Sequence, residues 1–131
     1  MIVGSNPTRP TITPVALMTL VEILNRHVRL FNDGVRTGNF GPMTSHFVES
    51  AEMRFEGIPV GPFRGRSAIE TAYSTQPPDD EIVVLNVKQE PGRSVIICEY
   101  AWSKKPKIRA GELILTSRGE MIEKLTVRYE R

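Results

Sequence analysis

Glutamates lie in segments that predict β-strands, and carboxylates held in a sheet can act as general acids or bases. Glu112 falls in the predicted strand 108–116, where it alternates with Ile114, so its face of the strand holds apolar neighbours. Such surroundings would favour the protonated acid and suit Glu112 to catalysis. Antiparallel pairing with the preceding strand would place Glu99 opposite Glu112, where the two carboxylates would share one proton. A one-residue bulge would instead put both in water.

Other candidate chemical groups carry weaker signals. Glu56 ends the predicted strand 52–56, and it could act as a base only through a bulge before Gly57; without one it is an exposed strand residue. His27 and His46 each sit beside an apolar residue, which is more typical of a boundary histidine than of a catalyst. No spacing of His, Cys and Asp predicts a metal site, and no cofactor is expected.

Composition and motifs exclude several classes of function. The chain has 131 residues and a formal net charge of +2, which fits one globular domain. It lacks the glycine-rich phosphate loops and the nucleophile elbow of α/β-hydrolases. Its basic residues gather only at one hairpin tip, Lys104 to Arg109, so no nucleic-acid partner is expected. The single cysteine, Cys98, and the lack of any long apolar segment predict a cytoplasmic protein without membrane contact.

Helical spacing of apolar residues predicts three helices. Residues 1–12 show no such period and are expected to form a poorly ordered arm ahead of a domain over 13–131. The first helix starts with a capping threonine and a proline and ends near residues 32–34. A short second helix is predicted over 41–48. The third runs over 67–74, where a serine and a glutamate have the spacing of a capping box.

Alternating patterns predict a strand at 52–56 and then a three-turn meander of strands over 82–89, 94–102, 108–116 and 121–129. The strand 94–102 is apolar on both faces. Helices would cover one face of the sheet, and a second subunit is the simplest cover for the other. We therefore expect an α+β fold and a homodimer through the sheet, although a central strand with more polar neighbours outside would give the same pattern.

Several segments together resemble the nuclear transport factor 2-like superfamily, which includes ketosteroid isomerase and the SnoaL-like polyketide cyclases. The most characteristic is Gly-Pro-Phe-Arg-Gly-Arg-Ser-Ala-Ile at 61–69, and the others are 30–34, 38–40, 46–47 and 54–57. The resemblance implies a cystatin-like cone, in which three N-terminal helices pack into a strongly curved antiparallel sheet. It also implies a pocket at the wide end and frequent homodimers.

The same resemblance argues against ketosteroid isomerisation. The position of the isomerase tyrosine corresponds to Phe31, which cannot donate a hydrogen bond, and the position of its base corresponds to Gly57. The third position corresponds to Gly111 or Glu112, because the turn that follows leaves the register uncertain by one residue. Most of the isomerase apparatus is therefore absent.

Aromatic residues are the expected lining of an apolar pocket. The candidate substrate-binding residues are Phe31, Phe55, Tyr73, Tyr100 and Trp102. Together with the candidate catalytic carboxylates Glu112 and Glu56, they predict a protein that binds a small apolar ligand. An isomerase, cyclase, dehydratase or hydrolase acting on an apolar carbonyl or polycyclic compound would fit that site. The alternative is a non-catalytic module for protein binding or dimerisation.

Overall fold

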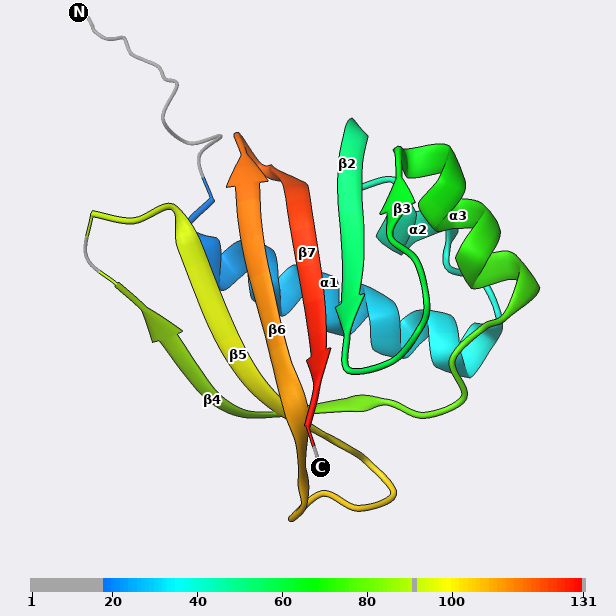
Figure 1. Cartoon of the computed structure of the whole chain (residues 1–131), viewed down its shortest axis with the longest axis vertical. Coiled ribbons are helices and arrows are strands. Elements are labelled where there is room, and N and C mark those ends of the chain that lie inside the picture. Colours follow the sequence, from blue (N-terminus) through cyan, green and yellow to red (C-terminus); the bar gives the residue numbers. More distant parts are fainter. Residues whose placement is uncertain (1–17, 91, 131) are drawn as a thin grey trace, which may run out of the picture.

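The computed structural model describes residues 18–90 and 92–130 (Figure 1). The predicted arm 1–12 and the predicted capping Thr13 lie outside these residues. In chain order the elements are α1 (Leu20–Thr37), α2 (Gly41–Thr44), β2 (Phe47–Glu56), β3 (Phe63–Arg64), α3 (Arg66–Thr75), β4 (Ile82–Gln89), β5 (Val95–Trp102), β6 (Arg109–Arg118) and β7 (Met121–Tyr129). The four strands of the predicted meander therefore form, each within two residues of its expected limits.

The strands form one curved, unclosed sheet in the order β3-β2-β7-β6-β5-β4. The expectation of a wholly antiparallel sheet is wrong at one junction, because β2 runs parallel to β7, with Met53 beside Leu125. A parallel pair needs a long connection, and the chain between β2 and β7 supplies it with α3 and four strands. Register shifts interrupt the β2–β7, β4–β5, β5–β6 and β6–β7 ladders, and such bulges bend strands.

The expectation of three N-terminal helices is also wrong. Only α1 and α3 are long; α2 is a single turn, because β2 takes over at Phe47. The chain is committed to the sheet there, since the His46 carbonyl accepts a hydrogen bond from Ile122 N at 2.8 Å. In chain order α3 follows β2 and β3, and in space α1 and α3 lie on the same side of the sheet (Figure 1).

Caps set the helix ends differently from the sequence-based expectation. In the described residues α1 begins after Thr19, whose side chain and that of Glu22 form a reciprocal capping box. The capping box expected at Ser67 does not form. The helix starts one residue earlier, after Gly65, whose φ of 94° few other residues adopt, and Ser67 is thereby already inside α3.

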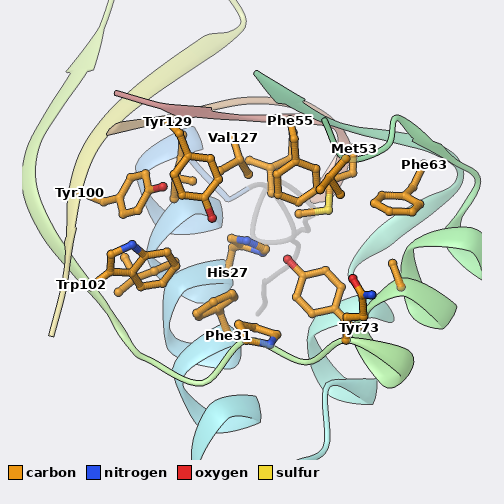
Figure 2. Close-up of a pocket in the computed structure, with 17 residues that line it drawn as sticks. His27, Phe31, Met53, Phe55, Phe63, Tyr73, Tyr100, Trp102, Val127 and Tyr129 are labelled. Carbon is orange, nitrogen blue, oxygen red and sulfur yellow. The ribbon is translucent and has the colours of Figure 1, made fainter. Parts of the chain in front are cut away.

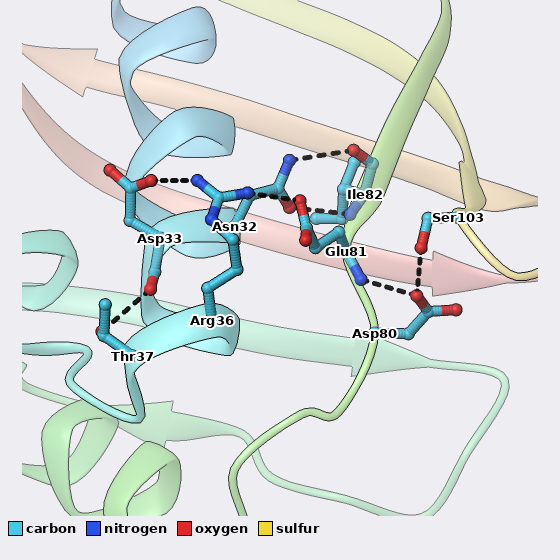
Figure 3. A network of polar contacts seen from close by, with 8 residues as sticks. All are labelled: Asn32, Asp33, Arg36, Thr37, Asp80, Glu81, Ile82 and Ser103. Carbon is cyan, nitrogen blue, oxygen red and sulfur yellow. Dashed lines mark hydrogen bonds and ion pairs between the residues drawn. The ribbon is translucent and has the colours of Figure 1, made fainter.

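A polar clamp joins the end of α1 to the start of β4 (Figure 3). The Asn32 side chain accepts from Ile82 N at 2.8 Å and donates to Ile82 O at 3.1 Å, so it replaces one strand partner. Arg36 pairs with Glu81 at 2.6 Å and also with Asp33. This polar clamp holds the end of α1 against β4, an edge strand of the sheet. It lies at Ile82, which lines the cavity described below.

Alternation along the strands divides the sheet into an inner face, turned toward the helices, and an outer face. In β5, Ile96, Cys98 and Tyr100 are fully buried on the inner face, whereas Ile97 and Glu99 are half-buried on the outer one. Cys98 is thus a core residue, and burial raises the pKa of its thiol to about 11. The inner face is the one that can form a site.

Candidate functional site

A cavity of about 240 Å³ lies between the inner face of the sheet and the two long helices (Figure 2). The helices contribute His27, Phe31, Ala72 and Tyr73 to its walls, and Gln76 follows directly after α3. The strands contribute Met53, Phe55, Phe63, Ile82, Tyr100, Trp102, Leu113, Leu125, Val127 and Tyr129, and Val60 and Pro78 complete it from loops. The pleat explains this set: the strand residues are alternate positions on the inner face.

All five aromatic residues predicted to bind substrate line this cavity: Phe31, Phe55, Tyr73, Tyr100 and Trp102. Their roles in binding stay a prediction. Tyr129 was not among the predicted residues and His27 was interpreted as a boundary histidine, yet both line the cavity. Tyr129 alternates with Val127 and Leu125 on β7, and His27 lies four residues before Phe31 on the buried face of α1, so both spacings carried the signal.

The walls carry no charge: among the described residues that line the cavity, none is Asp, Glu, Lys or Arg. Their polar atoms belong to one imidazole, three phenols, one indole N–H and one amide. Figure 2 shows the hydroxyls of Tyr73 and Tyr129 pointing into the cavity from opposite sides, with His27 between them. A site of this composition recognises ligands through apolar contact and a few neutral hydrogen bonds.

His27 is 3% exposed, and its Nδ1 has no hydrogen-bond partner. The ring meets the edge of Phe47 at a centroid distance of 5.8 Å. Burial, helped by the charge of Arg26 and by the neighbouring His46, lowers the pKa of His27 to about 4. His27 is therefore neutral at pH 7, with one ring nitrogen that donates and one that accepts.

Tyr100 is fully buried, and its hydroxyl has no hydrogen-bond partner. Across the sheet it pairs with Gly111, which in turn pairs with Tyr129. The Tyr100 and Tyr129 rings thus flank a position without a side chain. Burial raises the pKa of both phenols, and Tyr129 adds to the shift of Tyr100, but the two hydroxyls do not have the geometry of a hydrogen bond.

The structure resolves the register that the sequence left open. Gly111 faces inward and Glu112 outward, because Leu113 lines the cavity and successive residues of a strand point to opposite faces of the sheet. A Cβ at Gly111 would collide with the carbonyl oxygen of Arg128. Gly57, at the isomerase base position, has a φ of 95° and packs against the Tyr129 backbone. The backbone therefore favours glycine at both positions, at Gly57 because of its positive φ and at Gly111 because the Arg128 carbonyl lies so close.

The candidate catalytic carboxylates are not at the cavity. Glu112 lies on the outer face and contacts Arg128 at 3.0 Å and Arg109 at 3.1 Å. Glu56 also lies on that face and receives the Arg128 Nε–H at 2.9 Å. This placement corrects the expectation that Glu112 sits among apolar neighbours, since the basic residues beside it in space come from β7 and from the start of β6.

Glu99 does pair with Glu112 across the ladder, as the sequence predicted. The two carboxylates share arginines rather than a proton: Arg109 contacts Glu99 at 3.5 Å and Glu112 at 3.1 Å, and it also pairs with Glu130. The cluster made of Glu56, Glu99, Glu112, Glu130, Arg109 and Arg128 is called the outer ion-pair cluster below. Each of its carboxylates contacts at least one guanidinium group, so the cluster is a set of paired charges on the outer face.

A second hollow lies at the mouth of the cavity and shares Pro78, Trp102 and Tyr129 with it. Its border carries four charged side chains: Asp79, Asp80, Lys104 and Lys105. Asp80 is engaged by Ser103 and by Lys104 N at 3.1 Å, and these contacts, led by the Ser103 hydrogen bond, lower the pKa of its carboxyl. Charged groups therefore stand at the mouth, outside the apolar interior.

Within residues 18–90 and 92–130, no three His, Cys, Asp or Glu side chains come together where they could hold a metal ion. None of the helices in that part of the chain has the length and apolar character to cross a membrane.

No model of a protein family matches this chain, and no curated protein does. Solved structures do match. A Bacillus subtilis protein named as a "putative isomerase" superposes with a TM-score of 0.64 at 14% identity, over 86% of this chain and 90% of that one. An NTF2-like protein of unknown function from Cytophaga hutchinsonii gives a TM-score of 0.63 at 15% identity, over 94% and 95% of the two chains.

A third structure, from Methylobium petroleophilum, is a protein of unknown function with a cystatin-like fold. It gives a TM-score of 0.62 at 18% identity, over 93% of this chain and 80% of that one. Likeness at such identities concerns the fold, which these proteins share over most of their length. The chain has the NTF2-like, cystatin-like fold, as the resemblance of its sequence predicted.

Proposed function

We propose that the protein binds a small, predominantly apolar molecule in the cavity between the helices and the inner face of the sheet. The observation that carries this proposal is the cavity itself: about 240 Å³ of space with uncharged, largely aromatic and aliphatic walls. Protein interiors are normally packed without voids of this size. An apolar molecule that fills the space would gain contact with the wall and leave water.

Catalysis is not part of this proposal. The isomerase positions hold Phe31, Gly57 and Gly111, and the carboxylates expected to act as acid or base lie on the outer face. If the site has an activity of the isomerase or cyclase kind, its acid-base groups must be the neutral His27 and the tyrosines. A cytoplasmic location also stays a prediction.

Titration with naphthalene tests the proposal. The indole N–H of Trp102, the single tryptophan of the chain, lies in the cavity wall and gives one well-separated NMR signal. Ligand in the cavity is expected to shift that signal in a saturable manner. Mass spectrometry of an organic extract of the purified protein would show whether a natural ligand is retained.

Two variants on α3 make the test specific. Ala72→Phe introduces a ring from the cavity wall and is expected to reduce naphthalene affinity at least tenfold by occupying the space. Thr71→Phe places the same ring on the exposed side of the helix and is expected to leave the affinity unchanged. Equal affinity in both variants, or no saturable shift in the unmodified protein, would contradict the proposal.

The second candidate function is dimerisation through the outer face. Its support is a pair of half-buried isoleucines, Ile97 and Ile114, which are neighbours across β5 and β6 at the centre of that face. Sedimentation equilibrium is expected to show a homodimer that Ile114→Glu converts to a monomer. A monomer at all concentrations would remove this candidate and leave the cavity proposal untouched.

A further inference from the structure

We propose that His27 and Tyr100 form the polar recognition site of the cavity, and that they select a ligand whose polar group is an uncharged oxygen function, a hydroxyl or a carbonyl. The inference rests on the proposed function, because it names the class of molecule that the cavity accepts. It uses neither the outer carboxylates nor the positions at which the isomerase groups are missing.

The two residues present polar atoms that the protein leaves unsatisfied. Nδ1 of His27 and the hydroxyl of Tyr100 are both buried, and neither has a hydrogen-bond partner. They come from different elements, α1 and β5, and both side chains line the same cavity (Figure 2). Buried polar atoms without a partner destabilise a fold, so a pair of them in one cavity wall indicates an external hydrogen-bonding group.

The absence of charge in the described walls determines the kind of group. A carboxylate or an ammonium ion in the cavity would lose its hydration without meeting an opposite charge, which is far more unfavourable than burial of a neutral oxygen. The charged side chains of Lys104, Lys105, Asp79 and Asp80 stand around the hollow at the mouth. The groups inside are neutral donors and acceptors, and their natural partner is a neutral oxygen.

The volume sets the size of the apolar part. An apolar cavity of about 150 Å³ holds one benzene molecule, and the present cavity measures about 240 Å³. A bicyclic aromatic compound therefore suits it. Naphthalene, 2-naphthol and 2-naphthoate share one ring system and differ only in the polar group, so their relative affinities report on that group alone.

The first arm of the experiment compares these three compounds on the unmodified full chain at pH 7 by isothermal titration calorimetry. We expect 2-naphthol to bind about tenfold more tightly than naphthalene, the ratio that one or two net hydrogen bonds produce. We expect 2-naphthoate to bind at least a hundredfold more weakly than 2-naphthol, because its carboxylate has no cation to meet in the walls.

The second arm removes the proposed partners. Tyr100→Phe deletes one oxygen without changing the shape of the ring, and it is expected to reduce the preference for 2-naphthol over naphthalene about threefold, its share of the tenfold ratio. His27→Leu is expected to reduce it by a similar factor. Tyr73→Phe makes the same chemical change on the opposite wall and is expected to have a smaller effect. Glu112→Gln, on the outer face, is expected to leave all three affinities unchanged.

The outcomes separate this inference from the function on which it rests. If neither naphthalene nor 2-naphthol binds, the proposed function fails and the inference fails with it. If both bind equally well, or if Tyr100→Phe and His27→Leu leave the preference intact, the cavity is a binding site but the recognition site is wrong. Tight binding of 2-naphthoate that Lys104→Gln or Lys105→Gln abolishes would place the polar group of the ligand at the mouth and overturn the inference.

Discussion

The two faces of the sheet are built from the same strands and differ in how they treat polar groups. On β6 and β7 the inner positions hold Gly111, Leu113 and Tyr129, whereas the positions between them hold Glu112 and Arg128. The outer face collects charges and pairs them with each other. The inner face excludes charge, and two neutral polar atoms beside it stay unpaired: the Tyr100 hydroxyl on β5 and His27 Nδ1 on the facing helix α1. The presence of chemically reactive side chains such as glutamate is thus a poor guide to which face of the sheet forms the site.

The largest effect is expected from a change that fills the inner face at its most crowded point. Gly111→Ala would drive a methyl group into the Arg128 carbonyl, so the β6–β7 ladder must shift. We expect the free energy of unfolding to fall by at least about 3 kcal/mol, the upper end for overpacked sites. Urea denaturation measures it. Gly119→Ala, in a turn with open space around it, is the control and should cost only about 1 kcal/mol for its positive φ.

The next effect is a pH dependence of stability that comes from His27. Its folded-state pKa of about 4 lies below the ordinary value of 6.5, so between these values the unfolded chain binds the proton and the folded chain does not. This contribution is fully present above pH 6.5 and is lost as the pH falls toward 4, by about 3 kcal/mol in total.

Denaturation from pH 7 to pH 4 checks the dependence. In His27→Gln the loss over this window should shrink by that amount. Equal pH profiles for the unmodified protein and His27→Gln would show that His27 takes up its proton as readily in the folded state as in the unfolded chain.

A smaller effect with the opposite sign is expected at Tyr100. Tyr100→Phe removes a buried hydroxyl that has no partner, so the ligand-free protein should become more stable by about 1 kcal/mol. The melting temperature of the ligand-free protein reports this gain. A loss of stability would mean that the hydroxyl already has a hydrogen-bond partner in the folded protein. Of the two polar atoms beside the inner face, only His27 Nδ1 would then remain unpaired.

The smallest effect is expected on the outer face. Glu112→Gln weakens contacts to Arg109 and Arg128, but both arginines keep other carboxylate partners, Glu130 and Glu56. We expect a loss of at most about 1 kcal/mol, which should diminish in high salt because partly exposed ion pairs contribute little. A loss of several kcal/mol would show that the outer ion-pair cluster is a main support of the fold.

The sequence predicted the elements well because periodicity and turns are local properties. The strands of the meander and the pairing of Glu99 with Glu112 followed from alternation and turn position. The parallel contact of β2 with β7 did not, because it joins segments about 70 residues apart and depends on the closure of the whole sheet. The second helix was predicted too long because its last residues are taken by pairing with β7.

The candidate site was predictable in its apolar part and not in its polar part. Aromatic residues at inner positions lie where the pleat of each strand puts them. The side on which Glu112 falls depends on one residue of register, and its environment depends on Arg128, which only the folded sheet brings near. His27 was undervalued because the sequence shows that it lies on the buried side of a helix, but not that a cavity lies beside it.

One NMR measurement tests the contrast between the two faces directly. In a titration of the full chain with 2-naphthol, we expect the Trp102 indole N–H signal on the inner side to shift in proportion to occupancy. The Nε–H signals of Arg109 and Arg128 in the outer ion-pair cluster should stay in place. Shifts of the arginine signals with an unchanged indole signal would place the binding site on the outer face and contradict the account.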